Sequence, residues 1–333
     1  MQSGGANNSR RLAQTWPYPR HIRFERALRL AAARWFAERR PSFALHPRYP
    51  YILAKWEDWH ANIIDDETVR YIRAARESRL AEGGTFPLHD YLHHGLSSQA
   101  MLFNLMDPLL ARDELYALCQ PLAPSSCPWS STDVHAELEF SDRDVFHEDT
   151  GQPTSVDLAV IESGAGRKVF VEAKLAEKAF GGCSVFLAGD CDGRNPAQRF
   201  SMCYLHHIGR KYWDLLAKWG FLESAIGRDS TCVLASHYQF FRELLFSLEH
   251  GATFVLLSDR RSPTFACDGP DGRRGLMAFL ADLVPPQIRG RIAIVHVQDV
   301  VQSLKRSGQH PWAIEFCRKY GLEGLPSPLP QTT

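Results

Sequence analysis

The 333-residue chain contains no long run of apolar residues. A membrane-spanning helix needs roughly 18 or more consecutive apolar residues, and no stretch approaches that length. The N-terminus also lacks the apolar core of a secretory signal. We therefore expect a cytoplasmic protein that makes no use of a membrane.

An excess of one charge is missing as well. The 38 basic and 38 acidic residues give a formal net charge of zero. This value neither favours nor excludes a nucleic-acid partner, because binding depends on where the basic residues cluster. The length predicts either one large domain or a core with an accessory region.

Motifs of several common enzyme classes are absent. The sequence has no GxSxG elbow, no P-loop and no GxGxxG that opens a helix after a strand, and its His-His pairs at 93–94 and 206–207 are not part of an HExxH motif. These absences argue against serine hydrolases of the elbow type, P-loop NTPases, dinucleotide-binding enzymes and HExxH metalloproteases.

Composition and pattern divide the chain into three parts. Residues 1–92 are predicted to form a basic, mainly helical N-terminal region, and residues 93–310 an α/β domain with an insertion at about 176–232. Residues 311–333 are assigned to a C-terminal tail. The polar first ten residues and the Pro-rich end of the tail are predicted to be disordered.

Basic and aromatic residues are interleaved between residues 10 and 55, where Glu25 and Glu38 alone are acidic. Arginines such as Arg23 and Arg26 suit phosphate contacts, and the aromatic rings suit stacking on bases or sugars. The segment is therefore predicted to be a DNA-holding arm. The alternative is a helix that packs on the core through its aromatic residues. The composition also resembles an organelle transit peptide, although the many aromatics favour folded structure.

Apolar spacing after residue 95 predicts alternating helices and strands. Helical spacing occurs over 97–106, after which Asp107-Pro108 is expected to start a new helix, and again over 197–219 and 237–251. Strands are predicted over 133–141, in both arms of 153–178, and over 252–259 and 291–298. The order is helix, three strands, insertion, helix, strand, helix, strand.

The segment "PTSVDLAVIESGAGRKVFVEAKLAEK", residues 153–178, carries charge at the centre of two apolar strands. A side-chain period of two places Phe170, Glu172 and Lys174 on one face of the second strand. If Gly164-Ala165 is a two-residue hairpin loop, Asp157 lies opposite Glu172, with Cβ atoms roughly 4.5–5.5 Å apart. Two carboxylates this close repel each other, and a divalent cation such as Mg²⁺ relieves the repulsion.

Asp157, the strand–turn–strand interval and Glu172-Ala173-Lys174 resemble the active-site motif of the PD-(D/E)XK nuclease superfamily, which has the restriction-endonuclease-like fold. The resemblance spans about residues 95–260, and the element order agrees with the αβββαβ core and mixed central sheet of that superfamily. It implies a nuclease that uses Mg²⁺ or Mn²⁺, with Asp157 and Glu172 as metal ligands and Lys174 assisting the attacking water. The chain departs from the superfamily pattern because no Pro directly precedes Asp157; the nearest is Pro153.

Further candidates surround this motif. Glu137 or Glu139, on the polar face of the preceding strand, is expected to supply a third acidic ligand, as in some members of the superfamily. Gln99 and Gln239 are candidate active-site residues. The arginines proposed to contact nucleic acid, most simply DNA, are Arg23, Arg26, Arg194, Arg199 and Arg242. For each residue the alternative is an ordinary solvated position.

The eight cysteines are scattered through a long chain, which argues against a disulfide framework. Cys183, Cys191 and Cys203 follow the Glu172 strand at short intervals. Some nucleases of the resembled superfamily hold an iron–sulfur cluster with one upstream and three downstream cysteines. These residues are therefore candidate ligands for Zn²⁺ or an iron–sulfur cluster, and buried or free thiols are the alternative.

Three other interpretations stay open. The chain could be a catalytically inactive nucleic-acid-binding or structural protein of the same fold, or a metal-independent hydrolase that uses a carboxylate pair. The Glu172/Lys174 pair could also lie on the surface of an ordinary hairpin. The sequence does not decide the oligomeric state, and a homodimer is compatible with it.

Overall fold

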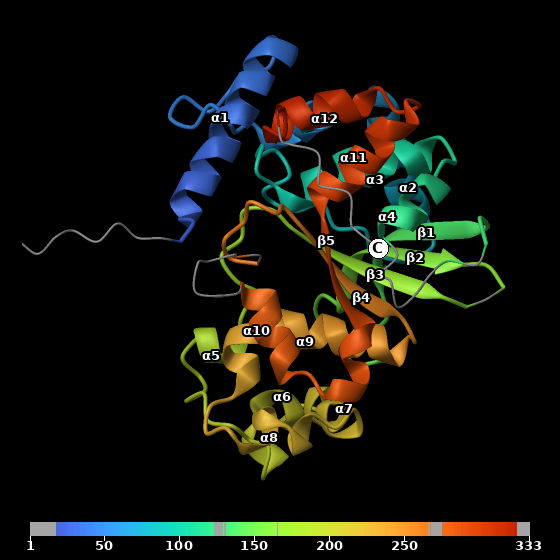
Figure 1. Ribbon diagram of the computed structural model, residues 1–333. Helices are drawn as coiled ribbons and strands as arrows, with labels where there is room; N and C mark the ends of the chain where they lie inside the picture. Colours follow the sequence, from blue (N-terminus) through green and yellow to red (C-terminus); the bar gives the residue numbers. More distant parts are fainter. Residues whose placement is uncertain are drawn as a thin grey trace, which may run out of the picture.

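The computed structural model describes residues 18–122, 129, 131–164, 166–265, 267 and 275–324. Within them, one five-stranded sheet lies between two layers of helices (Figure 1). In spatial order its strands are β1 (Val134–Ser141), β2 (Ser155–Glu162), β3 (Lys168–Lys174), β4 (Thr253–Ser258) and β5 (Ile292–His296). The β1–β2 and β2–β3 pairs are antiparallel, and the β3–β4 and β4–β5 pairs are parallel. The mixed sheet and its flanking helices confirm the predicted α/β fold.

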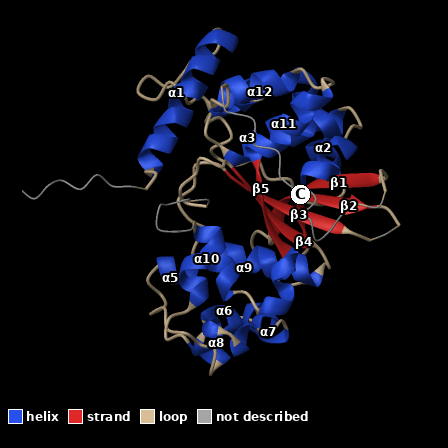
Figure 2. Ribbon diagram, in the orientation of Figure 1, coloured by secondary structure: helices blue, strands red, loops and turns tan. Residues whose placement is uncertain are grey.

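Helices cover both faces of this sheet (Figure 2). On one side lie α1 (His21–Arg39), η1 (Trp56–Asn62), α2 (Asp66–Ala81), α3 (Ser98–Ala111), α4 (Tyr116–Leu122), α11 (Val297–Ser307) and α12 (Trp312–Tyr320). The other side holds α5 (Ser184–Leu187), η2 (Phe200–Met202), α6 (Tyr204–His207), α7 (Tyr212–Lys218), η3 (Phe221–Glu223), α8 (Ala225–Arg228), α9 (Val233–Glu249) and α10 (Leu276–Leu283), and η4 (Pro286–Arg291) leads into β5. None of the helices in the described ranges is long and apolar enough to cross a membrane.

The alternation of side chains along β3 divides the interior into two cores. Val169, Val171 and Ala173 belong to a first core, on the side of α3 and α11. Phe170 belongs to a second core, on the side of α9. Because both faces are covered, the central strands read as nearly continuous apolar runs. Glu172 and Lys174 of β3 are therefore buried, with 4% and 7% of their surface exposed.

Helix α1 packs on the rest of the protein, chiefly against α12. Its buried side chains are those of Phe24, Leu28, Ala32, Trp35 and Phe36. Trp35 is 3% exposed and Phe36 is fully buried, as expected for the alternative in which this segment is a helix docked through its aromatic residues.

Residues 312–320, which were predicted to belong to a tail, form helix α12. Trp312, Phe316 and Tyr320 recur at helical spacing and are buried in the first core. The helix therefore belongs to the folded domain. Residues 1–10 and 325–333, which were predicted to be disordered, lie outside the described residues.

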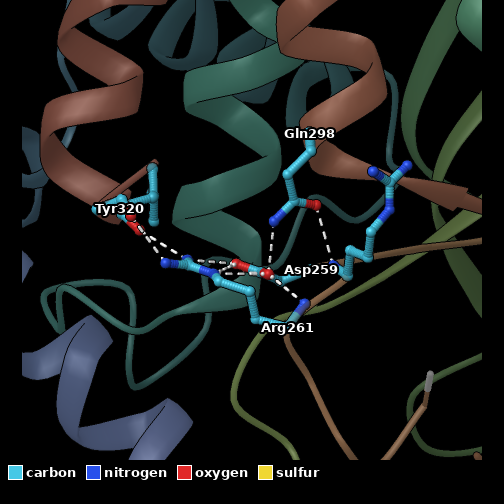
Figure 3. Close-up of polar contacts among 6 residues, drawn as sticks. Asp259, Arg261, Gln298 and Tyr320 are labelled. Atoms are coloured by element: carbon cyan, nitrogen blue, oxygen red, sulfur yellow. Dashed lines mark hydrogen bonds and ion pairs between the residues drawn. The ribbon is translucent and has the colours of Figure 1, made fainter. Parts of the chain in front are cut away.

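A buried polar network fixes α11 and α12 to the end of β4 (Figure 3). Asp259, directly after β4, accepts a hydrogen bond from Nε2 of Gln298 on α11 at 2.6 Å and from Nη2 of Arg261 at 2.6 Å. The Arg261 guanidinium also donates to the backbone carbonyls of Tyr320 and Gly321, each at 2.8 Å. Because both carboxylate oxygens have protein partners, this cluster stabilises the fold.

Two helix predictions were wrong in detail. The segment 197–219 contains η2, α6 and α7 instead of one helix, and Gly209 between the last two adopts φ = +87°, which a helix cannot contain. Conversely, α3 continues through Asp107-Pro108 to Ala111. Dense burial of α3 in the first core stabilises this helix despite the hydrogen bond that proline removes. Helix α9 ends near Gly251, as predicted.

Candidate functional site

The register of the β2–β3 hairpin brings the two predicted metal ligands together. Leu158 pairs with Val171. Because the strands are antiparallel, Asp157, one residue before Leu158, lies opposite Glu172, one residue after Val171. Ala165 of the proposed turn lies outside the described residues, but the pairing is the one that a Gly164-Ala165 loop predicts. The two acidic residues are 9% and 4% exposed.

Asp157 contributes to the hairpin with its side chain. Its Oδ2 accepts a hydrogen bond from the backbone N–H of Ala173 at 2.8 Å. Burial raises the pKa of Asp157 well above its ordinary value, and the nearby carboxylates of Glu172 and Glu139 raise it further. The electrostatic crowding expected from the sequence is therefore present at this position.

Glu139 is the third member of the row. On β1 the pairs Leu138–Leu158 and Phe140–Val156 flank it, which places it opposite Asp157. Its backbone adopts φ = +51°, a conformation uncommon for residues other than glycine. After this residue the strand changes face, because Leu138 packs in the first core whereas Phe140 packs against the second.

Gln99 holds Glu139 in place. Its Nε2 donates to Glu139 Oε1 at 2.7 Å, and its own Oε1 accepts from the backbone N–H of His89 at 2.9 Å. Burial is the main cause that raises the pKa of Glu139 to about 7. Glu137, the other acidic candidate on β1, instead forms an ion pair with Arg79 at 2.6 Å. The structure therefore distinguishes two residues that the sequence left equivalent.

Glu172, Lys174 and Gln239 form a compact polar triangle. Lys174 Nζ lies 2.6 Å from Glu172 Oε1 and 3.2 Å from Gln239 Oε1, and Gln239 Nε2 donates to Glu172 Oε1 at 2.8 Å. Burial alone lowers the pKa of Lys174, but the carboxylates of Glu172, Glu177 and Glu243 outweigh it and the pKa is raised. The lysine is therefore a buried ammonium ion.

These groups surround one cavity of about 220 Å³ at the end of β3. A volume of this size accommodates a phosphate group and several water molecules. Its lining residues are His89, Ser98, Glu139, Gln152, Ser155, Asp157, Glu172, Lys174, Glu177, Gln239, Arg242 and Glu243. Of the residues predicted for the active site, only Gln99, behind Glu139, and Glu137 do not line it.

Two acidic residues of the cavity were not predicted from the sequence. Glu243 lies one helical turn after Gln239 on α9 and is 1% exposed. Its pKa is raised, first by burial and then by Glu172. Glu177 follows β3, and its Oε2 accepts a hydrogen bond from the backbone N–H of Leu175 at 2.6 Å. The i, i+4 spacing from Gln239 to Glu243 was the signal that pointed to the first of them.

The predicted nucleic-acid-binding arginines fall into two groups. Arg242 lines the cavity, its guanidinium lies 5.2 Å from the centre of the Tyr238 ring, and its buried Nε has no hydrogen-bond partner among the described residues. Arg23 and Arg26 are exposed on α1. Arg194 and Arg199 are exposed in the segment between β3 and α9. None of these four lines the cavity.

As the side chains stand, no three His, Cys, Asp or Glu residues in the described part of the chain are grouped to hold a metal ion. Glu172 and Asp157 are hydrogen-bonded to protein donors instead. Mg²⁺, however, is commonly bound through only one or two carboxylates and several waters. The Asp157–Glu172 pair provides such ligands at the cavity.

Comparison with known proteins supports a relation to restriction endonucleases. A family model described as "Restriction Endonuclease associating with ARP" matches residues 29–321. No curated protein and no solved structure matches the chain. The matched range includes the whole sheet and every residue that lines the cavity. The chain therefore belongs to the family of restriction endonucleases associating with ARP.

Proposed function

We propose that the protein is a metal-dependent nuclease of the PD-(D/E)XK type that hydrolyses phosphodiester bonds in DNA. The observation that carries the proposal is the position of Asp157 opposite Glu172, with Lys174 Nζ 2.6 Å from Glu172. Membership of a restriction-endonuclease family supports the same assignment at a coarser level.

Asp157 and Glu172 are the residues that would hold Mg²⁺ or Mn²⁺, because hard cations prefer carboxylate oxygens. Glu139, opposite Asp157, would provide a third carboxylate for the cation. When bound, the cation supplies positive charge that neutralises the phosphate. Gln99 keeps Glu139 oriented toward the cavity through its 2.7 Å hydrogen bond.

Positively charged side chains of the protein also take part in the proposed reaction. Lys174 orients a water molecule for in-line attack on phosphorus and stabilises the negative charge that develops there. Gln239 holds the ammonium group through its Oε1 and Glu172 through its Nε2. Arg242 lines the cavity, and its guanidinium would bind a phosphate oxygen there.

The carboxylates favour an enzyme over a passive binding module. Burial and mutual repulsion raise the pKa values of Asp157 and Glu139, so the arrangement weakens folding when no cation is bound. Negative charge also opposes binding of a polyanion. A protein that only bound DNA would gain nothing from this row of acids.

Cleavage assays on purified protein test the proposal. Supercoiled plasmid, linear duplex DNA, single-stranded DNA and RNA are incubated with Mg²⁺ or with EDTA, and we expect Mg²⁺-dependent cleavage of DNA. Asp157→Asn, Glu172→Gln and Lys174→Ala should each lower the rate roughly 100-fold or more, since loss of a residue that merely supports a metal ligand already costs 10–100-fold. Double variants should be hardly worse than single ones.

Glu137→Gln is the matched control, because Glu137 lies on β1 two residues from Glu139 but pairs with Arg79 outside the cavity. It should retain wild-type activity. Cleavage that persists in EDTA would favour a carboxylate-pair hydrolase. DNA binding without cleavage of any substrate would favour the inactive protein of the same fold.

A further inference from the structure

Four cysteines meet at one small cavity in the lobe between β3 and the beginning of α9. Cys183, Cys191, Cys203 and Cys232 all line a space of about 20 Å³. The other lining residues are Val185, Phe186, Tyr204, Leu205, Leu234 and Ala235. No charged side chain lines this space, and none of the four cysteines forms a disulfide. The three cysteines singled out in the sequence are thus joined by a fourth, Cys232.

The four cysteines lie in loops or at their ends, and the sulfur atom of one of them accepts a backbone hydrogen bond. Cys183, Cys203 and Cys232 are the N-cap residues of α5, α6 and α9. The N–H group of Gly193 donates to Cys191 Sγ at 3.4 Å, and burial raises the pKa of Cys232 to about 11. The donor stabilises a thiolate at Cys191, and Cys232 would lose its proton when a metal binds, because the thiolate is the form in which cysteine binds metals.

The chain is shaped to bring the four segments close together. Gly193 adopts φ = +73°, and a Cβ on Gly182 would lie only 2.5 Å from the carbonyl oxygen of Ala235. Both positions therefore need glycine, and they lie beside Cys191 and Cys183. Hydrogen bonds from Cys232 N to Gly193 O at 2.8 Å and from Cys183 N to Leu234 O at 3.1 Å join the segments.

We propose that Cys183, Cys191, Cys203 and Cys232 form a four-thiolate site for a thiophilic metal, either Zn²⁺ or an iron–sulfur cluster. Soft thiolate ligands select these metals over Mg²⁺. In their present positions, no three of these four cysteine side chains are grouped closely enough to hold one metal ion. Binding therefore either draws the sulfur atoms inward to about 2.3 Å from a single Zn²⁺ or joins them to different iron atoms of a cluster.

This arrangement differs from that of the nucleases mentioned above, in which one cysteine upstream of the hairpin completes the set. Cys119, which lies upstream, is buried on α4 among residues of the first core, on the opposite side of the sheet. Cys127 lies outside the described residues. The new member, Cys232, begins α9, the helix that carries Gln239 and Arg242. The metal site would therefore fix the start of a helix that lines the cavity.

Metal analysis of the full-length protein tests the proposal. The protein is produced with zinc or iron supplied, the iron sample is handled without oxygen, and zinc, iron and acid-labile sulfide are measured per chain. About one zinc per chain, or iron and sulfide in equal amounts with visible absorption, would support the site and identify its metal. Less than about a tenth of an equivalent of either metal would overturn it.

Cys203→Ser and Cys232→Ser should lower the metal content to background. Cys317→Ser is the control, because Cys317 is a buried cysteine on α12 in the first core and should leave the metal content unchanged. If Cys203→Ser and Cys232→Ser do not fold, titration of the wild-type protein with a mercurial reagent replaces them as the test. Release of metal in proportion to the thiols modified supports the site, whereas metal that stays bound after all thiols have reacted excludes it.

Discussion

The row Glu139–Asp157–Glu172 explains why strands with buried apolar neighbours carry charge at their centres. Each residue belongs to a different strand, and the pairing of β1, β2 and β3 aligns them. Their oxygens face a cavity that also contains the Lys174 ammonium. Without a compensating cation, these three buried carboxylates destabilise the folded protein, which is typical of functional sites.

The pKa of Glu139 leads to a prediction about stability. Burial raises this pKa from 4.5 to about 7, so the protonated carboxyl favours the folded state. Its contribution is fully present below about pH 4.5 and is lost as the pH rises through 7. Without divalent cations, Glu139→Gln should therefore raise the melting temperature at pH 8 by several degrees, corresponding to at most about 3 kcal/mol.

Thermal unfolding in EDTA across this pH range checks the prediction. The gain should shrink toward zero as the pH falls to 4.5, and Glu137→Gln, on the same strand, should show no such trend. A gain that does not depend on pH would mean that folding does not raise the pKa of Glu139.

Gln239 is expected to act as a positioning residue, since it contacts both Lys174 and Glu172. Gln239→Ala should lower kcat about 10–100-fold, as is usual when a partner of a ligand is removed, while KM changes little. Steady-state kinetics on DNA measure this split. The control is Gln198→Ala, an exposed position in the lobe. A rise in KM with unchanged kcat would instead assign Gln239 to substrate binding.

The sequence predicted the pairing of Asp157 with Glu172 because short-range geometry determines it. A glycine turn and the two-residue period of strands suffice to place Asp157 opposite Glu172. Glu139 could not be separated from Glu137, because a positive φ at Glu139 reverses the alternation, and that value depends on tertiary packing. Glu243 was missed since its approach depends on how α9 docks on the sheet.

The helices likewise differ in how well the sequence predicted them. The apolar stripe of α9 and Gly251 after it predicted this helix correctly. The helix predicted over 197–219 was wrong, because glycine at 209 outweighs the helical spacing around it. For α1 the basic residues suggested an arm, whereas its buried aromatic residues dock it on α12.

The structural role of helix α1 and its predicted role as a DNA-holding arm can be tested separately. Deleting residues 1–55 should destabilise the protein, because removing one buried aromatic such as Trp35 already costs about 3–5 kcal/mol. Arg23→Gln with Arg26→Gln should leave folding intact, since both side chains are exposed. If both arginines contact phosphates, the slope of log affinity against log salt should flatten by up to about 1.8.

The measurement is a salt series of DNA affinities, with circular dichroism as the folding check. Arg306→Gln, at an exposed position on α11, is the control and should leave the slope unchanged. An unchanged slope in the folded double variant would show that α1 is a structural helix only.

Across the whole molecule, the sheet separates two cores and the cavity lies at the edge of the second. Helices α1, α11 and α12 stabilise the far side, and the Asp259–Arg261 network joins them to β4 (Figure 3). The sequence predicted the α/β class and the order of the elements. It did not predict the return of α12 to the core, because short helices with few residues per face depend on tertiary packing.

Metal binding tests the central claim most directly, because it does not require the preferred DNA substrate. Mn²⁺ titrated into the protein is followed by electron paramagnetic resonance, which reports free Mn²⁺. We predict at least one tight Mn²⁺ site in wild type and in Glu137→Gln. The affinity of this site should rise with pH, because the carboxylates lose their protons. The site should be lost in Asp157→Asn and in Glu172→Gln, both checked for folding. Equal binding by wild type and these two folded variants would contradict the assignment of the metal site.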